Sequence, residues 1–130
     1  MSAKRALADT SVFVGVENGR LENAALDDYE LAVSVVTLGE LELGVIRGRD
    51  PDATARRLGT LRLAQQFDPM PVDEQVAAAW ALLVAKLRGA GRKAPINDTW
   101  IAATAIRHGV PLVTQDADHQ HMPDLTVVPV

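Results

Sequence analysis

The segment from Pro95 to Asp118 combines an amphipathic helix with a short apolar strand, and it constrains the fold more than any other part of the chain. Pro95 and the polar pair that follows Ile96 are typical of the start of a helix. Three apolar residues then follow Asp98 at helical spacing: Ile101, Ala102 and Ala105. Asp98 therefore begins the stripe that faces the core, which is an unusual position for a carboxylate.

The second half of this segment predicts a strand with an acidic residue beyond its end. His108-Gly109 ends the helix, and Pro111–Thr114 has the apolar character of a short buried strand. Asp116 follows that strand at its carboxyl end. In open α/β sheets, ligands bind in the crevice beyond the carboxyl ends of the strands, so Asp116 is a candidate site residue together with Asp98.

A length of 130 residues and a hydrophobic content of 48% predict one globular domain, spanning residues 1–130. The chain has no cysteine, which excludes disulfides, thiolate catalysis and cysteine-ligated zinc. No apolar run is long enough to cross a membrane, and Asp9 interrupts the apolar stretch near the N-terminus, so we expect a cytoplasmic protein. The net charge of −4 argues against nucleic-acid binding by overall charge attraction alone.

Short strands alternate with helices along the chain. Strands are predicted at Arg5–Asp9, Glu30–Ser34, Phe67–Val72 and Leu125–Val130, besides Pro111–Thr114. Helices are predicted at Val12–Val16, Leu21–Asp28 and Val35–Arg47, from Asp50 to Gln66, and from Asp73 to the region of Gly89. This alternation implies parallel pairing, so the fold class is α/β, with a parallel sheet of about four or five strands flanked by helices.

Four acidic residues form the candidate site: Asp9, Glu40, Asp98 and Asp116. Asp9 ends the first predicted strand, much as Asp116 follows a later one. Clustered carboxylates repel one another and rarely persist without a cation, and oxygen ligands suit Mg²⁺ or Mn²⁺. Such a site polarises a phosphoryl oxygen and activates a water molecule, and no thiol or serine–histidine–acid arrangement competes as the nucleophile.

Each acid also has a purely structural interpretation. Asp9 and Asp98 are both placed to cap a helix. Helical spacing does not choose between Glu40 and Glu42, since each shares a stripe with apolar residues. Asp116 lies in a polar loop, where a role in a turn is the commoner one. From the residues alone, both interpretations stay open.

Three stretches together resemble PIN-domain ribonucleases, and within that family the VapC-type toxins of bacterial and archaeal toxin–antitoxin pairs. They read ADTSVFV from residue 8, SVVTLGELELG from residue 34, and INDTWIAATAIRHGVPLVTQDAD from residue 96. The resemblance covers nearly the whole chain in the same order, and its late segment is the most specific part. It implies a PIN-like three-layer sandwich.

The resemblance implies a site made of Asp9, Glu40, Asp98 and Asp116, which act as catalytic residues and as ligands of Mg²⁺ or Mn²⁺. Glu40 is chosen over Glu42 because Leu41 and Gly44 follow it as in the family's E-L-x-x-G helix. Three polar residues fall where the family has side chains that support the carboxylates by hydrogen bonds: Ser11, Asn97 and Thr114. Asp118 is a further candidate ligand.

The resemblance also implies metal-dependent hydrolysis of an RNA phosphodiester by water. The basic residues just before Asp98 are the candidate RNA contacts: Arg88, Arg92 and Lys93. A VapB-like antitoxin is expected to inhibit the protein, and the protein is expected to form a homodimer. The apolar faces of Leu21–Asp28 and Val35–Arg47 are candidate surfaces for these two contacts.

One departure from the family lies after Asp116, where an aromatic residue is common and this chain has His119-Gln120-His121. Histidines two apart beside aspartates are plausible ligands of a transition metal, but we expect them to be exposed loop residues.

Two other functions fit less well. A receiver-type phosphoacceptor domain needs a lysine at a late strand end, where this chain has Thr114-Gln115-Asp116. A catalytically silent PIN-like binding module would have lost at least one acid, and all four are present.

Overall fold

The computed structural model describes residues 4–130; residues 1–3 of the predicted domain lie outside the described residues. Its centre is a parallel sheet in the order β3-β2-β1-β4-β5. The strands are β1 (Lys4–Ala8), β2 (Tyr29–Ser34), β3 (Asp68–Met70), β4 (Leu112–Thr114) and β5 (Val127–Pro129). The predicted α/β class with a parallel sheet is confirmed.

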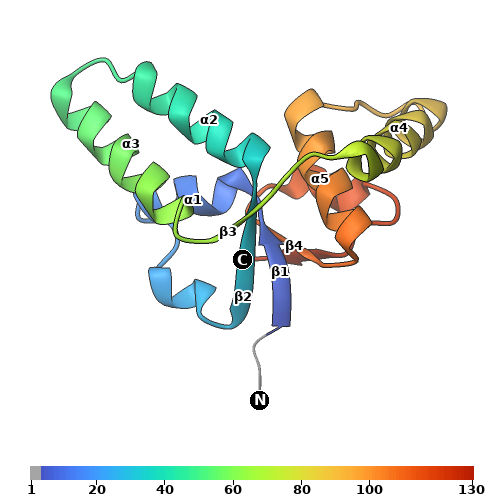
Figure 1. Ribbon diagram of the computed structural model, residues 1–130, viewed down its shortest axis with the longest axis horizontal. Coiled ribbons are helices and arrows are strands. Elements are labelled where there is room, and N and C mark those ends of the chain that lie inside the picture. The colour runs from blue at the N-terminus through green and yellow to red at the C-terminus, as the bar shows by residue number, and fades with distance from the viewer. Residues whose placement is uncertain (1–3) are drawn as a thin grey trace.

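Helices cover both faces of the sheet. They are α1 (Thr10–Glu17), α2 (Val35–Ile46), α3 (Pro51–Ala64), α4 (Glu74–Gly89) and α5 (Ile96–His108), with two short 3₁₀ helices, η1 (Asn23–Leu26) and η2 (Ala117–His121). In Figure 1, α1, α2 and α3 lie on one side of the strands, and α4 and α5 lie on the other. The molecule therefore has the three layers that the resemblance to PIN domains implied.

Two hydrophobic cores follow from the alternation of side chains along the central strands. Ala6 and Ala8 of β1 pack with α1, α2 and α3 around Phe13. Leu7, which lies between them in the chain, packs with Ile101 and Ala105 of α5 instead. Successive residues of a strand point to opposite faces, so a five-residue strand supplies both cores at once.

Polar side chains cap the starts of three helices. The side chains of Ser34, Asp50 and Asp73 accept hydrogen bonds from backbone N–H groups in the first turns of α2, α3 and α4. Gly109 follows α5 with a left-handed backbone, φ 65°, and ends that helix as predicted.

Two predicted elements are wrong in kind. Leu21–Asp28 was expected to be a helix, but only the single 3₁₀ turn η1 forms there, because this short segment buries only Leu26 as an anchor. The polar stretch after Asp116 was expected to be a loop, but it contains η2, whose start Asp116 caps by accepting a hydrogen bond from the N–H of Asp118. Both corrections concern short segments whose structure depends on a few anchoring contacts.

Proline restricts the sheet at both edges. The edge strands β3 and β5 contain Pro69 and Pro129, and each is only three residues long. A proline has no N–H to donate, so it is tolerated where one side of the strand has no neighbour. Within residues 4–130, no helix is long and apolar enough to cross a membrane.

The order of the strands locates a crevice. From β1 the chain first builds outward through β2 and β3, and it then crosses to the other side of β1 to form β4 and β5. In open α/β sheets, the boundary at which the strand order reverses is where ligands bind, beyond the carboxyl ends. Here that boundary lies between β1 and β4, which Asp9 and Gln115 directly follow.

Candidate active site

Asp9 is the buried acid at the centre of the site. It directly follows β1, and only 3% of its surface is exposed. Its Oδ2 atom accepts hydrogen bonds from the hydroxyls of Ser11, at 2.7 Å, and Thr114, at 2.8 Å. Although Asp9 occupies the N-cap position of α1, its side chain caps no N–H group of that helix. The carboxylate is thus turned into the crevice, and the capping interpretation is wrong.

The same two hydroxyls accept hydrogen bonds from the chain beyond β4. Ser11 Oγ accepts from the N–H of Gln115, and Thr114 Oγ1 accepts from the N–H of Asp116, both at 2.9 Å. A hydroxyl has a single proton to donate, and each gives it to Asp9. The result is a fixed network in which Oδ2 of Asp9 is held from both sides and Oδ1 stays available.

Asp98 reaches the same place from the first turn of α5. Its neighbour Thr99 is fully buried, donates to the carbonyl of Pro95 and accepts a hydrogen bond from the indole N–H of Trp80 in α4. Trp100, two residues after Asp98, stacks on Trp80 with ring centroids 4.4 Å apart. These contacts fix the start of α5 against α4, and with it the direction of the half-exposed Asp98 side chain. The predicted capping alternative does not apply, since no side chain caps α5.

Glu40 lies in α2 and is held from two directions. Its Oε1 accepts a hydrogen bond from Thr10 Oγ1 at 2.7 Å, and its Oε2 accepts from the amide of Asn97 at 3.4 Å. Glu42, the alternative that helical spacing left open, is exposed. The structure therefore brings Glu40, and not Glu42, to the crevice.

Two threonines in this arrangement were not singled out as site residues by the sequence analysis. Thr10 donates to Glu40, and its oxygen lies 2.9 Å from the hydroxyl of the buried Thr37. Thr37 is the donor of that pair, because the one proton of Thr10 is given to Glu40. The available signal was the position of Thr10, directly after Asp9.

Asp116 and Asp118 differ in position. Asp116 is half-buried, and its Oδ1 accepts the hydrogen bond that caps η2. This agrees with the role in a turn that was expected for it. Asp118 is exposed and lines a different cavity, of about 410 Å³, together with Arg92, Lys93 and His121. Arg88 is exposed on α4 and is not among the residues that line this cavity.

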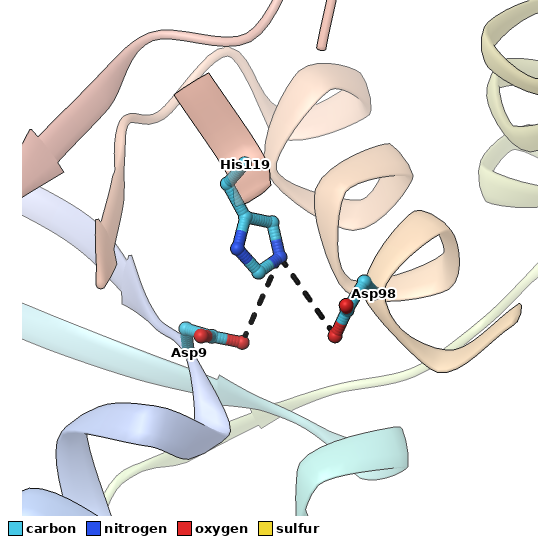
Figure 2. Close-up of side chains that lie close together, drawn as sticks. All are labelled: Asp9, Asp98 and His119. Atoms are coloured by element: carbon cyan, nitrogen blue, oxygen red, sulfur yellow. Dashed lines mark ion pairs between the residues drawn. The ribbon is translucent and has the colours of Figure 1, made fainter. Parts of the chain in front are cut away.

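His119 is the main correction to the sequence analysis. It was expected in an exposed loop, but it is fully buried, and its Nε2 atom lies 3.9 Å from Asp9 Oδ1 and 4.0 Å from Asp98 Oδ1. Figure 2 shows the imidazole directed into the space between the two carboxylates. The turn of η2, which Asp116 starts, brings the ring into this position. His121, two residues later, is exposed as expected.

The electrostatics of the site are those of crowded acids. Burial raises the pKa of Asp98 above its ordinary value of 3.8, and the carboxylates of Asp9, Asp116 and Glu40 raise it further, while His119 lowers it. One donor atom from each of Asp9, Asp98 and His119 lies within 4.8 Å of the others. A cation in this space would relieve the repulsion, and carboxylate oxygens are the ligands that divalent ions such as Mg²⁺ and Mn²⁺ take.

Comparison with known proteins gives a consistent result. Residues 6–125 match the family described as PIN domain. The chain is 55% identical to Ribonuclease VapC4 of Mycobacterium tuberculosis over 130 residues, which cover 100% of both chains. It is 44% identical to Ribonuclease VapC5 of the same organism over 110 residues, covering 85% of this chain and 82% of that one.

Solved structures agree with these relatives. A crystal structure of VapBC-5 from Mycobacterium tuberculosis, a member of the VapBC family of toxin-antitoxin systems, superposes with a TM-score of 0.86 at 36% identity, over 97% of this chain and 98% of that one. FitAcB from Neisseria gonorrhoeae superposes with a TM-score of 0.75 at 28% identity, over 94% and 95% of the two chains.

Proposed function

The chain belongs to the PIN-domain family, and on that basis we propose that it is a metal-dependent endoribonuclease toxin held inactive by a cognate antitoxin. The observation that carries the proposal is the convergence of four carboxylates on one crevice. Asp9 and Asp98 place carboxylate oxygens within 4.8 Å of each other, and Asn97, next to Asp98 in the chain, donates to Glu40. Asp116 and Glu40 also raise the pKa of Asp98, so a cation here would offset a shared negative charge. The names of the relatives, which are ribonucleases and members of toxin–antitoxin systems, supply the reaction class.

The residues present fit a divalent cation. Asp9 keeps one oxygen free of the hydroxyls that hold the other, and a carboxylate oxygen of Asp98 lies within 4.8 Å of one of Asp9. Asp9 and Asp98 would hold the ion, with Asp116 and Glu40 completing the site directly or through water; Asp118 is a weaker ligand because it is exposed. Mg²⁺ and Mn²⁺ are the ions that this oxygen-rich set takes.

Hydrolysis needs an activated water and a stabilised phosphoryl group, and a bound divalent ion supplies both by acting as a Lewis acid. The water oxygen bonds to phosphorus as the bond from phosphorus to one ribose oxygen breaks. Glu40 accepts the proton that the water gives up. Ser11, Thr114 and Asn97 hold Asp9 and Glu40 in place, which leaves the carboxylates little freedom to turn away from the reacting groups.

RNA reaches the site across a locally basic surface. Arg92 and Lys93 line the cavity of about 410 Å³ that lies next to the start of α5, and both are exposed. Arg88 adds a third positive charge on the last turn of α4. Such side chains hold the phosphates of a nucleic acid, and the net charge of −4 of the whole chain does not oppose a contact made at this short range.

The antitoxin and a second copy of the chain are the partners we propose. Leu43 and Ile46 of α2 are exposed to 49% and 76%, which is unusual for large apolar side chains on a helix that flanks a site. This face is our candidate surface for the antitoxin. Titration of the antitoxin into the cleavage assay tests that partner, and sedimentation of the free protein tests the homodimer.

The first experiment measures RNA cleavage by purified protein, free of antitoxin, with Mg²⁺, with Mn²⁺ and with chelator. Wild-type protein should cleave only with metal. Asp98→Asn and Glu40→Gln should each lower the cleavage rate by about 100-fold or more. Loss of a residue that only hydrogen-bonds to a metal ligand already lowers metal affinity or activity by about 10–100-fold, and these two carboxylates act at the site itself.

Glu42→Gln is the matched control, since Glu42 lies two residues from Glu40 on the same helix but is exposed. It should cleave like wild type. Equal cleavage by wild-type and Asp98→Asn protein would assign the activity to a contaminant and contradict the proposal. A folded wild-type protein that binds metal and RNA but cleaves no RNA would favour a silent binding module.

A further inference from the structure

His119 is distinguished from every other buried polar group in the described part of the chain. Among residues 4–130, the only buried side-chain nitrogen and oxygen atoms without a hydrogen-bond partner are its Nδ1 and Nε2. Buried polar groups in folded proteins are almost always paired, and an exception indicates a strained site or a missing water or ion. A fully buried imidazole with neither nitrogen satisfied therefore points to a ligand.

The direction of the ring indicates what kind of ligand the imidazole fits. Nε2 faces Asp9 Oδ1 at 3.9 Å and Asp98 Oδ1 at 4.0 Å (Figure 2). Both distances are too long for hydrogen bonds. They are, however, within the roughly 4.4 Å that two ligands on opposite sides of one ion can span, since nitrogen and oxygen ligands lie about 2.0–2.2 Å from such an ion.

We propose that His119 is a nitrogen ligand of the metal site, which makes the site a mixed nitrogen–oxygen site that favours a first-row transition ion such as Mn²⁺ over Mg²⁺. Imidazole suits transition metals, whereas Mg²⁺ prefers oxygen ligands and keeps several waters. This inference rests on the metal-binding part of the proposed function. It adds a ligand that the set of four acids does not contain.

The position of His119 depends on the same residues that build the acidic site. Asp116 caps η2 through the N–H of Asp118, and the N–H of Met122 donates to the carbonyl of His119 to close the turn. Met122 itself is buried against Leu83, Leu87 and Ala102. The turn is thus anchored at both ends, and the imidazole is held over the carboxylates before any ion binds.

The test uses metal binding rather than RNA cleavage. Mn²⁺ is bound to protein without a histidine tag, and its pulsed electron paramagnetic resonance spectrum is searched for coupling to an imidazole nitrogen. The chain has three histidines, so a His108→Gln/His121→Gln double variant leaves His119 as the only imidazole. We expect the nitrogen coupling in wild-type protein and in this double variant.

Affinity gives a second readout. His119→Phe keeps a planar ring of similar size but removes the nitrogen ligand. It should weaken Mn²⁺ binding by at least about tenfold, which is the smallest loss of affinity expected even for a residue that only hydrogen-bonds to a metal ligand. Binding of Mg²⁺ should change much less, so the preference for Mn²⁺ falls. His121→Phe, in the same turn but exposed, should leave both affinities unchanged.

Mn²⁺ that binds wild-type protein without nitrogen coupling would overturn the role of His119 and leave the acidic metal site intact. A His119→Phe protein with an unchanged Mn²⁺ preference would do the same. If neither ion binds the wild-type protein, this inference and the metal dependence of the proposed function fail together. If His119→Phe does not fold, the spectrum of the double variant decides alone.

Discussion

The two carboxylate oxygens of Asp9 have different surroundings, and this difference defines the site at the scale of single residues. Oδ2 accepts from Ser11 and Thr114, while Oδ1 faces His119. Hydrogen bonds to a charged group are stronger than those between neutral groups, so two of them hold the carboxylate firmly. Among residues 4–130, no side chain donates a hydrogen bond to Asp98, and burial instead raises its pKa.

The raised pKa of Asp98 predicts how stability depends on pH without metal. The folded protein binds the proton of the Asp98 carboxyl group more tightly than the unfolded chain does. Protonation of Asp98 therefore stabilises the folded state, and this stabilisation is fully present below the ordinary pKa of 3.8. It is lost as the pH rises through the raised, folded-state pKa. Asp98→Asn is uncharged at every pH, so in chelator at pH 7 it should melt at a higher temperature than wild type.

The gap in melting temperature should close as the pH falls toward 3.8. Saturating Mn²⁺ should reverse the order, because the ion stabilises the protein that binds it more tightly. Melting curves in chelator and in Mn²⁺, measured at several pH values, check both points. A wild-type protein more stable than the variant at pH 7 in chelator would show that the charge of Asp98 is compensated by the protein itself.

At the scale of elements, the ends of α5 and the start of η2 direct the functional side chains. The sequence predicted the end of α5 from Gly109, whose φ of 65° suits a residue without a Cβ atom. It did not predict η2, because the polar residues of that segment are equally typical of a loop. A contact with a distant residue, Met122 against α4 and α5, decides that this segment folds back.

Two glycine substitutions should change stability in opposite directions. Gly109→Ala forces a Cβ atom into a left-handed position and should destabilise the protein by about 1–2 kcal/mol. Gly59→Ala lies in the exposed interior of α3, where an added Cβ meets no atom within 4 Å, and it should stabilise by about 0.5–1 kcal/mol. Denaturant midpoints with an unchanged slope measure both changes. Equal effects of the two substitutions would contradict the conformational explanation.

At the scale of the whole molecule, the strand order places the site and the distribution of charge guides the substrate. The reversal between β1 and β4 brings together residues from the two ends of the chain, such as Ser11 and Thr114. With a net charge of −4, the protein cannot attract RNA by its overall field. We therefore propose that RNA binding depends on the local cations next to α5.

Removing those cations should weaken RNA binding and change its dependence on salt. In an Asp98→Asn background, which should bind RNA without cleaving it, Arg92→Gln/Lys93→Gln should lower the affinity. It should also reduce the magnitude of the slope of log affinity against log salt by about 1.4. Each lost contact with a phosphate of single-stranded RNA contributes about 0.7, and the variant loses two such contacts. Arg62→Gln is the control, because Arg62 is exposed on α3, on the other side of the sheet (Figure 1). An unchanged slope would place the RNA elsewhere.

The sequence alone determined the alternation of strands and helices, the parallel sheet and the strand-end positions of Asp9 and Asp116. These features depend on local patterns of apolar residues, caps and breakers, which act over a few neighbouring positions. The tertiary structure decided which groups surround each acid. In the folded chain, Thr10 and Asn97 donate hydrogen bonds to Glu40, whereas Glu42 is exposed. The buried His119 lies between Asp9 and Asp98. Those contacts join residues far apart in the chain, and their geometry exists only once the layers have packed.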